Sequence, residues 1–176
     1  MILFRNCPPA LQFYWEVPNQ PAARWHGDDE GPAQYLATTP DAAWAEFLRH
    51  EGITDPADLA GVERAIWAID VNVELLALAD PRLALPVLVG DETSYPQCQA
   101  EARRLRGAGA IGLKAPSAAV DRTTASGHRT EGGLVPGRPR DESTVVLFGM
   151  RPDDLGWVAC AIGRPSVEQL RRVRHL

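Results

Sequence analysis

Hydrophobic and polar positions change their period several times along the chain, which predicts a mixture of strands and helices. Residues 2–5 (ILFR) and 34–38 (QYLAT) are short stretches of strand-forming residues, and each predicts a strand. Residues 12–17 (QFYWEV), set among prolines, predict a short extended piece. Further strands are predicted for residues 63–78, as one long strand or a pair, for 110–115, and, as buried strands, for 143–149 and 155–163.

Helical segments are marked by their start and stop residues. Thr39 is a suitable N-cap, and Pro40 fits the first helical position. The helix predicted to follow carries an apolar stripe and stops at Gly52. The same reasoning predicts a second helix over residues 94–109 and a short helix from Ser166 near the end of the chain.

Residues 120–142 differ in composition from the rest of the chain. They hold few large apolar side chains but four glycines and two prolines, which predicts a long loop with the character of a lid. Strands outnumber helices and do not alternate with them regularly. The pattern therefore predicts one α+β domain over 1–176 with a mixed or antiparallel sheet, a core over about 3–148, and a C-terminal strand and helix over 155–175.

Composition narrows the possible functions. The 176 residues are 45% hydrophobic and 23% charged, with a net charge of −5, which favours a folded domain and argues against a protein that coats nucleic acid. No apolar run has the length of a membrane span, and the first residues do not resemble a signal peptide. Three separated cysteines suit reduced thiols in the cytoplasm, and four scattered histidines predict no metal site.

Three residues with chemical potential follow one another at equal intervals of 11 residues. They are Arg24, Tyr35 and Glu46, placed around a predicted strand and the capped helix after it. A cation, a phenol and a carboxylate in this order are either separate surface groups or parts of one pocket. The spacing alone leaves both interpretations open.

Short motifs extend this set in both directions. LFR ends in Arg5, AARWH carries Arg24, QYLAT carries Tyr35, AAWAE carries Glu46, and APSA carries Ser117. Together with a helix before Gly112 and the stretch VVLFG, these motifs resemble in order the RES domain family, the toxin half of bacterial RES–Xre toxin–antitoxin pairs. The chain departs from the family pattern where Ala22 and Ala23 replace a Gly-Gly pair and His26 replaces an Asn.

The resemblance implies a fold like that of ADP-ribosyltransferases and NAD as the substrate, with no metal. It implies that Glu46 and Arg24 are catalytic and that NAD is bound by Arg5, Arg24, Tyr35 and Ser117 in one concave site. The expected reaction breaks the nicotinamide–ribose bond. The enzyme would be a glycohydrolase or a phosphorylase that depletes NAD, or alternatively an ADP-ribosyltransferase that modifies a protein. The expected partner is an Xre-type helix-turn-helix antitoxin, with no direct contact to nucleic acid or membrane.

Each residue also has an ordinary structural interpretation. Glu46 could be a solvent-facing helix residue paired with Arg49 or His50, and Arg5 and Arg24 could be surface charges. Tyr35 could be a core tyrosine with a satisfied hydroxyl group, and Ser117 part of an ordinary turn. If all of these hold, the chain is a non-catalytic interaction module.

Overall fold

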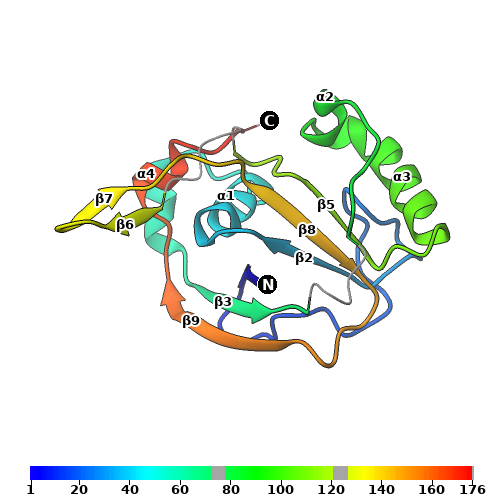
Figure 1. Cartoon of the computed structure of the whole chain (residues 1–176), viewed down its shortest axis with the longest axis horizontal. Coiled ribbons are helices and arrows are strands. Elements are labelled where there is room, and N and C mark those ends of the chain that lie inside the picture. The colour runs from blue at the N-terminus through cyan, green and yellow to red at the C-terminus, as the bar shows by residue number, and fades with distance from the viewer. Residues whose placement is uncertain (73–77, 121–126, 176) are drawn as a thin grey trace.

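The computed structural model describes residues 1–72, 78–120 and 127–175. These residues form a seven-stranded sheet in the order β4-β5-β8-β2-β1-β3-β9 and a separate two-stranded sheet, β6-β7. β8 and β2 cross the middle of the molecule, with α2 and α3 at one end and β6 and β7 at the other (Figure 1). The strands are β1 (Ile2–Cys7), β2 (Ala33–Ala37), β3 (Arg64–Asp70), β4 (Leu78–Ala79), β5 (Gly112–Pro116), β6 (His128–Thr130), β7 (Leu134–Pro136), β8 (Ser143–Phe148) and β9 (Leu155–Gly163).

The large sheet is antiparallel except at one edge, where β4 runs parallel to β5. The mixed, mostly antiparallel sheet of an α+β domain is therefore confirmed. The helices are α1 (Pro40–His50), α2 (Leu85–Leu88), α3 (Tyr95–Gly107) and α4 (Val167–Leu170), with 3₁₀ turns η1 (Pro56–Gly61) and η2 (Glu92–Ser94).

The register of the central strands separates two faces of the sheet. Phe4 of β1 lies opposite Ala37 of β2, and Ala37 lies opposite Thr144 of β8, so these side chains share a face. We call it the helix face, because both α1 and α3 pack on it. The α1 residues cluster with Ala37 and Ile66, while the α3 residues cluster with Ala33, Leu113 and Val146.

The opposite face, which we call the loop face, is covered by the segment that follows β1. Leu3, Leu36, Ile69, Val145 and Leu147 point to it from four neighbouring strands, and Phe13 and Tyr14 pack against them. Residues 12–17 thus cover the sheet, and the short extended piece predicted there forms no strand. Their aromatic side chains pack in the core, but their backbone pairs with no strand.

The start of α1 agrees with its sequence signals. Thr39 has extended backbone angles, and its side-chain oxygen accepts the backbone N–H of Ala42 at 3.1 Å. Pro40 follows in the first turn, where its missing N–H is not needed. After the helix Gly52 has a φ of 63°, a left-handed conformation that glycine adopts without a steric penalty. Local sequence signals therefore mark both the first and the last residues of α1.

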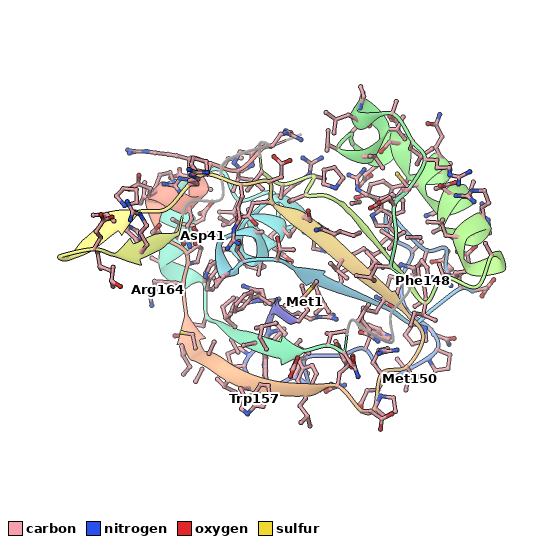
Figure 2. All side chains as sticks on the ribbon, in the orientation of Figure 1. Met1, Asp41, Phe148, Met150, Trp157 and Arg164 are labelled. Carbon is pink, nitrogen blue, oxygen red and sulfur yellow. The ribbon has the colours of Figure 1, made fainter. Side chains whose placement is uncertain are left out.

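Two predictions about the second half of the chain need correction. The long loop predicted over 120–142 contains the hairpin of β6 and β7, and part of that loop, residues 121–126, lies outside the described residues. β9 was expected to be a buried strand, but it lies at an edge of the sheet. Trp157 is 54% exposed and Ile162 is 67% exposed; Trp157 is labelled in Figure 2. Residues 73–77 of the predicted strand pair also lie outside the described residues.

Candidate functional site

Glu46 lies at the centre of a small hydrogen-bonded group between α1 and the sheet. Its Oε1 atom accepts the hydroxyl of Ser117 at 2.7 Å and the hydroxyl of Thr144 at 2.9 Å. No described residue donates a hydrogen bond to the other carboxylate oxygen, Oε2. Glu46 itself is half-buried. The two hydroxyl groups therefore fix the orientation of the carboxylate through one oxygen, and the described residues leave the other without a donor.

Ser117 reaches Glu46 because β5 ends just before it. The residue is 3% exposed, its backbone N–H donates to the carbonyl of Glu142, and its side-chain oxygen also accepts the N–H of Ala119. Accepting that N–H leaves the hydroxyl proton free to point at the carboxylate of Glu46. The serine acts as a donor to Glu46, and among the residues that the structure describes no His or Asp bonds to it as the base of a nucleophile would.

Thr144 was not predicted as a site residue. It lies on the helix face of β8, where its neighbour across the sheet is Ala37 and its diagonal neighbour is Tyr35. A threonine in an apolar strand gives no functional signal by itself. Its contact with Glu46 arises only when α1 packs on that face.

Arg24 lies in a tight turn that is held from two sides. The backbone of Ala23 and His26 forms an isolated β-bridge, and Gln99 of α3 donates to both carbonyls. Tyr35 supports the same turn from the sheet, since its hydroxyl accepts the N–H of Trp25 at 2.9 Å and is hydrogen-bonded to Nδ1 of His26 at 2.9 Å. The hydroxyl of Tyr35 is thus satisfied by protein groups.

Burial shifts the ionisation of this aromatic pair. It raises the pKa of Tyr35 above its ordinary value and lowers the pKa of His26, which is fully buried. Both groups therefore favour their neutral forms. The pair acts as an uncharged support for the turn that carries Arg24.

The Arg24 side chain is 9% exposed and extends towards the start of α3. Its Nη1 donates to the hydroxyl of Ser94 at 3.0 Å, and its Nη2 donates to the carbonyl of Gly90 at 2.6 Å. The guanidinium also lies 4.8 Å from the centre of the Tyr95 ring. Arg24 is thus a buried cation whose hydrogen-bond and ring partners among the described residues are all uncharged.

Arg49 connects Arg24 with the group around Glu46. It donates to the carbonyls of Gly90 at 2.8 Å and of Ala118 at 2.5 Å, and Ala118 directly follows Ser117. From the sequence, Arg49 was considered only as an ion-pair partner of Glu46, and within the described residues no such ion pair forms. Its position one turn after Glu46 on the same helix was the signal available.

Arg5 does not join these residues. It lies opposite Trp67 on the loop face of β1, and its Nη1 donates to Gln34 at 3.1 Å. Burial lowers its pKa from the ordinary value for arginine. Because alternate residues of a strand point to opposite faces, the sheet itself separates Arg5 from Tyr35 and Thr144. The structure therefore does not place Arg5 with the expected NAD-binding residues.

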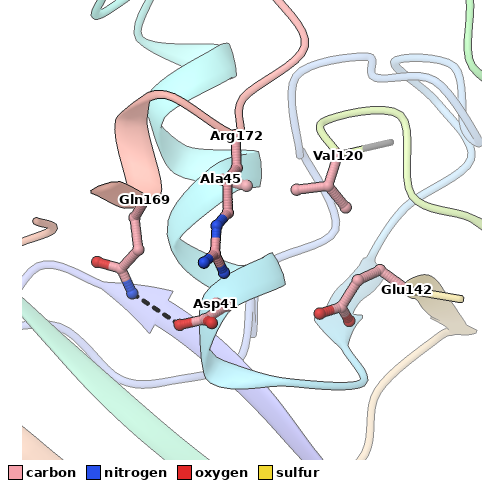
Figure 3. Close-up of a pocket in the computed structure, with 6 residues that line it drawn as sticks. All are labelled: Asp41, Ala45, Val120, Glu142, Gln169 and Arg172. Carbon is pink, nitrogen blue, oxygen red and sulfur yellow. Dashed lines mark hydrogen bonds between the residues drawn. The ribbon is translucent and has the colours of Figure 1, made fainter. Parts of the chain in front are cut away.

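A separate pocket lies beside the N-terminal half of α1 (Figure 3). In it, Gln169 of α4 donates to Asp41 at 2.7 Å. Its lining contains none of the predicted site residues and consists of Asp41, Ala45, Val120, Glu142, Gln169 and Arg172.

Over the ranges that the structure describes, no group of three or more His, Cys, Asp or Glu side chains is arranged to hold a metal ion. The helices within those ranges include none that is both long and apolar enough to cross a membrane.

Comparison with known proteins assigns the fold to a family. The RES domain model matches residues 8–155, which is most of the chain, and the chain belongs to the RES domain family. Its structure is similar to a chain in the crystal structure of the M. tuberculosis MbcT–MbcA toxin–antitoxin complex. The two share 17% sequence identity with a TM-score of 0.62, over 98% of this chain and 88% of the other. No curated protein matches the sequence.

Proposed function

We propose that this RES-domain chain is a toxin-type enzyme that cleaves the bond between nicotinamide and ribose in NAD. The observation that carries the proposal is the geometry of Glu46. Two hydroxyl groups hold one carboxylate oxygen, and the other has no described protein partner. A carboxylate that is oriented but not neutralised by a cation keeps its charge available for a substrate.

The chemistry of the bond explains the need for such a group. When nicotinamide leaves, positive charge develops on the ribose, as in the oxocarbenium-like transition state of glycoside hydrolysis. A fixed carboxylate beside the sugar stabilises that charge more in the transition state than in the ground state. In this proposal Glu46 has that role, and Ser117 and Thr144 keep its carboxylate in position.

Arg24 supplies the opposite charge that NAD requires. A guanidinium binds phosphate oxygens with two parallel hydrogen bonds, and its charge does not depend on pH in the physiological range. In this proposal Arg24 contacts the diphosphate, and Tyr35 positions the turn that carries it. Arg5 is left out, since it lies on the loop face. NAD is the substrate, and no step that we assign to these residues needs a metal.

The proposal also includes a partner and a compartment. The structural neighbour was crystallised as a toxin–antitoxin complex. We infer that this chain is likewise held inactive by a protein antitoxin, of the helix-turn-helix Xre type that the RES resemblance implies. The cytoplasm is the proposed site of action, since NAD and a reducing environment for the three free cysteines are found there.

The experiment that tests the proposed reaction identifies its products. The protein is incubated with NAD, and free nicotinamide and the ADP-ribosyl product are followed by NMR with and without inorganic phosphate. Release that requires phosphate indicates phosphorolysis, and release without it indicates hydrolysis. Release only after addition of a protein acceptor indicates ADP-ribosyl transfer. If NAD is not consumed under any of these conditions, the enzyme proposal fails and an interaction module remains.

A further inference from the structure

Arg49 makes more contacts than an ordinary surface arginine. Its Nη1 donates to the carbonyls of Ala118 at 2.5 Å and Arg174 at 2.9 Å, and its Nη2 donates to the carbonyl of Gly90 at 2.8 Å. These carbonyls come from three separate segments: the turn after β5, the C-terminal tail and the turn before α3. The guanidinium is therefore fixed in one position before any ligand arrives.

The same Gly90 carbonyl oxygen also accepts Nη2 of Arg24 at 2.6 Å. Two guanidinium groups thus meet at one oxygen atom, and their nearest nitrogens are no farther apart than two hydrogen bonds in series. Among the described residues, neither Arg24 nor Arg49 makes an ion pair with a carboxylate. Two adjacent positive charges are consequently held by neutral carbonyl and hydroxyl groups.

This arrangement is unfavourable for the free protein. Burial lowers the pKa of Arg49, and the neighbouring charge of Arg24 lowers it further. Nearby Glu46 acts in the opposite direction, although within the described residues it forms no ion pair with Arg49. Like charges brought together away from water repel one another, and an anion that binds both removes that repulsion.

We propose that Arg24 and Arg49 together form a diphosphate-binding site, in which Arg49 is the second phosphate-binding residue. Two adjacent cations match two adjacent phosphate groups, and each guanidinium retains N–H groups beyond those bound to the carbonyls. The identification of the ligand as NAD rests on the function proposed above. The binding of a diphosphate is inferred from the two arginines alone and does not rest on that function.

The location of the pair agrees with that role. Arg49 and Glu46 lie on the same side of α1, one turn apart, and Arg49 grips the carbonyl of the residue that follows Ser117. A diphosphate held by the pair therefore lies beside the carboxylate proposed to face the ribose. A purely structural role as a link between carbonyls would require hydrogen-bond donors but no paired positive charges.

Inorganic pyrophosphate and ADP-ribose, titrated into the full-length protein by calorimetry, test the site without any need for catalysis. For Arg49→Gln we expect the affinity for both ligands to fall by about tenfold or more, because a charge-assisted contact is lost. Arg49→Lys keeps the charge but not the fork, and we expect a smaller loss. Arg103→Gln is the control, since Arg103 is an exposed residue of α3 that forms an ion pair with Glu30.

Thermal melting of each variant separates binding from folding. If Arg49→Gln does not fold, two other measurements decide whether the pair binds a diphosphate. They are the affinity of Arg49→Lys and the rise in melting temperature of the unchanged protein when pyrophosphate is added. The inference is overturned if pyrophosphate does not bind the unchanged protein, or if a folded Arg49→Gln variant binds it equally well. Pyrophosphate binding that depends on Arg49, without NAD cleavage, would support this site and refute the proposed reaction. NAD cleavage that is unaffected in Arg49→Gln would support the proposed reaction and refute this site.

Discussion

Ser117 donates a 2.7 Å hydrogen bond to Glu46, although the two residues are 71 positions apart in the sequence. Glu46 comes from α1, and Ser117 comes from the turn after β5. The packing of α1 on the helix face is therefore what brings the carboxylate to its donor. Thr144, from a third element, completes the group.

Loss of either hydroxyl group should reduce catalysis without preventing substrate binding. In Ser117→Ala and Thr144→Val, the Glu46 carboxylate loses one of its two orienting donors. We expect kcat for nicotinamide release to fall by about tenfold in each variant and KM to change little, as for an interaction that acts in the transition state. Steady-state kinetics with NAD provide the measurement.

The exposed Thr130 of β6 provides a matched control, because its replacement by Val leaves the Glu46 group intact. A kcat unchanged in both Ser117→Ala and Thr144→Val would show that neither hydroxyl positions Glu46 for the reaction.

Tyr35→Phe should weaken both the fold and the binding of NAD. The change removes the acceptor of the Trp25 N–H and the partner of His26. An unsatisfied buried donor costs about 1–3 kcal/mol, and we expect a loss of that size in urea unfolding. The turn that carries Arg24 should also become less well fixed, so NAD affinity measured by calorimetry should fall.

Tyr14→Phe separates these two effects. Tyr14 donates to Asp154 at 3.0 Å from the loop face, away from Arg24. We expect it to lose stability and retain NAD affinity. An equal loss of affinity in both variants would contradict the specific role of Tyr35.

Gly112→Ala should destabilise the sheet. A Cβ atom at this position of β5 would lie 2.7 Å from the carbonyl oxygen of Val146 and 2.9 Å from Leu78. Overpacking of this kind costs about 1–3 kcal/mol, which urea unfolding would detect. Gly61→Ala is the control, because nothing lies within 4 Å of its added Cβ. If both variants unfold at the same urea concentration as the unchanged protein, the packing described around β5 is incorrect.

Glu142 should make stability depend on pH in a specific direction. Its hydrogen bonds from Thr38 and Thr39 favour the charged form, but burial outweighs them and raises its pKa above the ordinary value of 4.5. Neighbouring Asp41 acts in the same direction as burial, and Arg140 acts against it. Above pH 4.5 the folded state therefore holds this proton more tightly than the unfolded state, and its contribution to stability falls as the pH rises through the folded-state pKa.

Glu142→Gln removes this ionisation. Relative to the unchanged protein, its free energy of unfolding should increase between pH 4 and pH 7, as measured by urea unfolding at a series of pH values. Exposed Glu16, replaced by Gln, is the control. A difference between Glu142→Gln and the unchanged protein that is constant across this range would contradict the raised pKa.

The elements with local signals were predictable from the sequence. The cap at Thr39 and the stop at Gly52 defined α1, and the strand-forming residues around Tyr35 defined β2. Such features depend on neighbouring residues alone. β9 was expected to be buried because it is apolar, but its position in the sheet is set by its pairing with β3, which no local pattern encodes.

The site was less predictable, because it depends on which side of an element each residue occupies. Arg5 belongs to a strand predicted correctly, yet the register of β1 turns it to the loop face. Thr144 has ordinary surroundings in the sequence, and only the packing of α1 on the sheet brings it to Glu46. Arg49 is near Glu46 on α1, but its bond to the carbonyl of Ala118 also depends on that packing. Sequence motifs thus indicated several residues of the candidate site, but they missed Thr144, whose place in it depends on tertiary contacts.

The central claim is that the Glu46 carboxylate stabilises the transition state of NAD cleavage. It is tested most directly by the rate of nicotinamide release in Glu46→Gln, measured beside NAD affinity in the same preparation. We predict that kcat falls by about 100-fold or more while NAD affinity changes by less than about threefold. Glu51→Gln, at the end of the same helix, should retain the full rate. A Glu46→Gln variant that releases nicotinamide as fast as the unchanged protein would contradict the account.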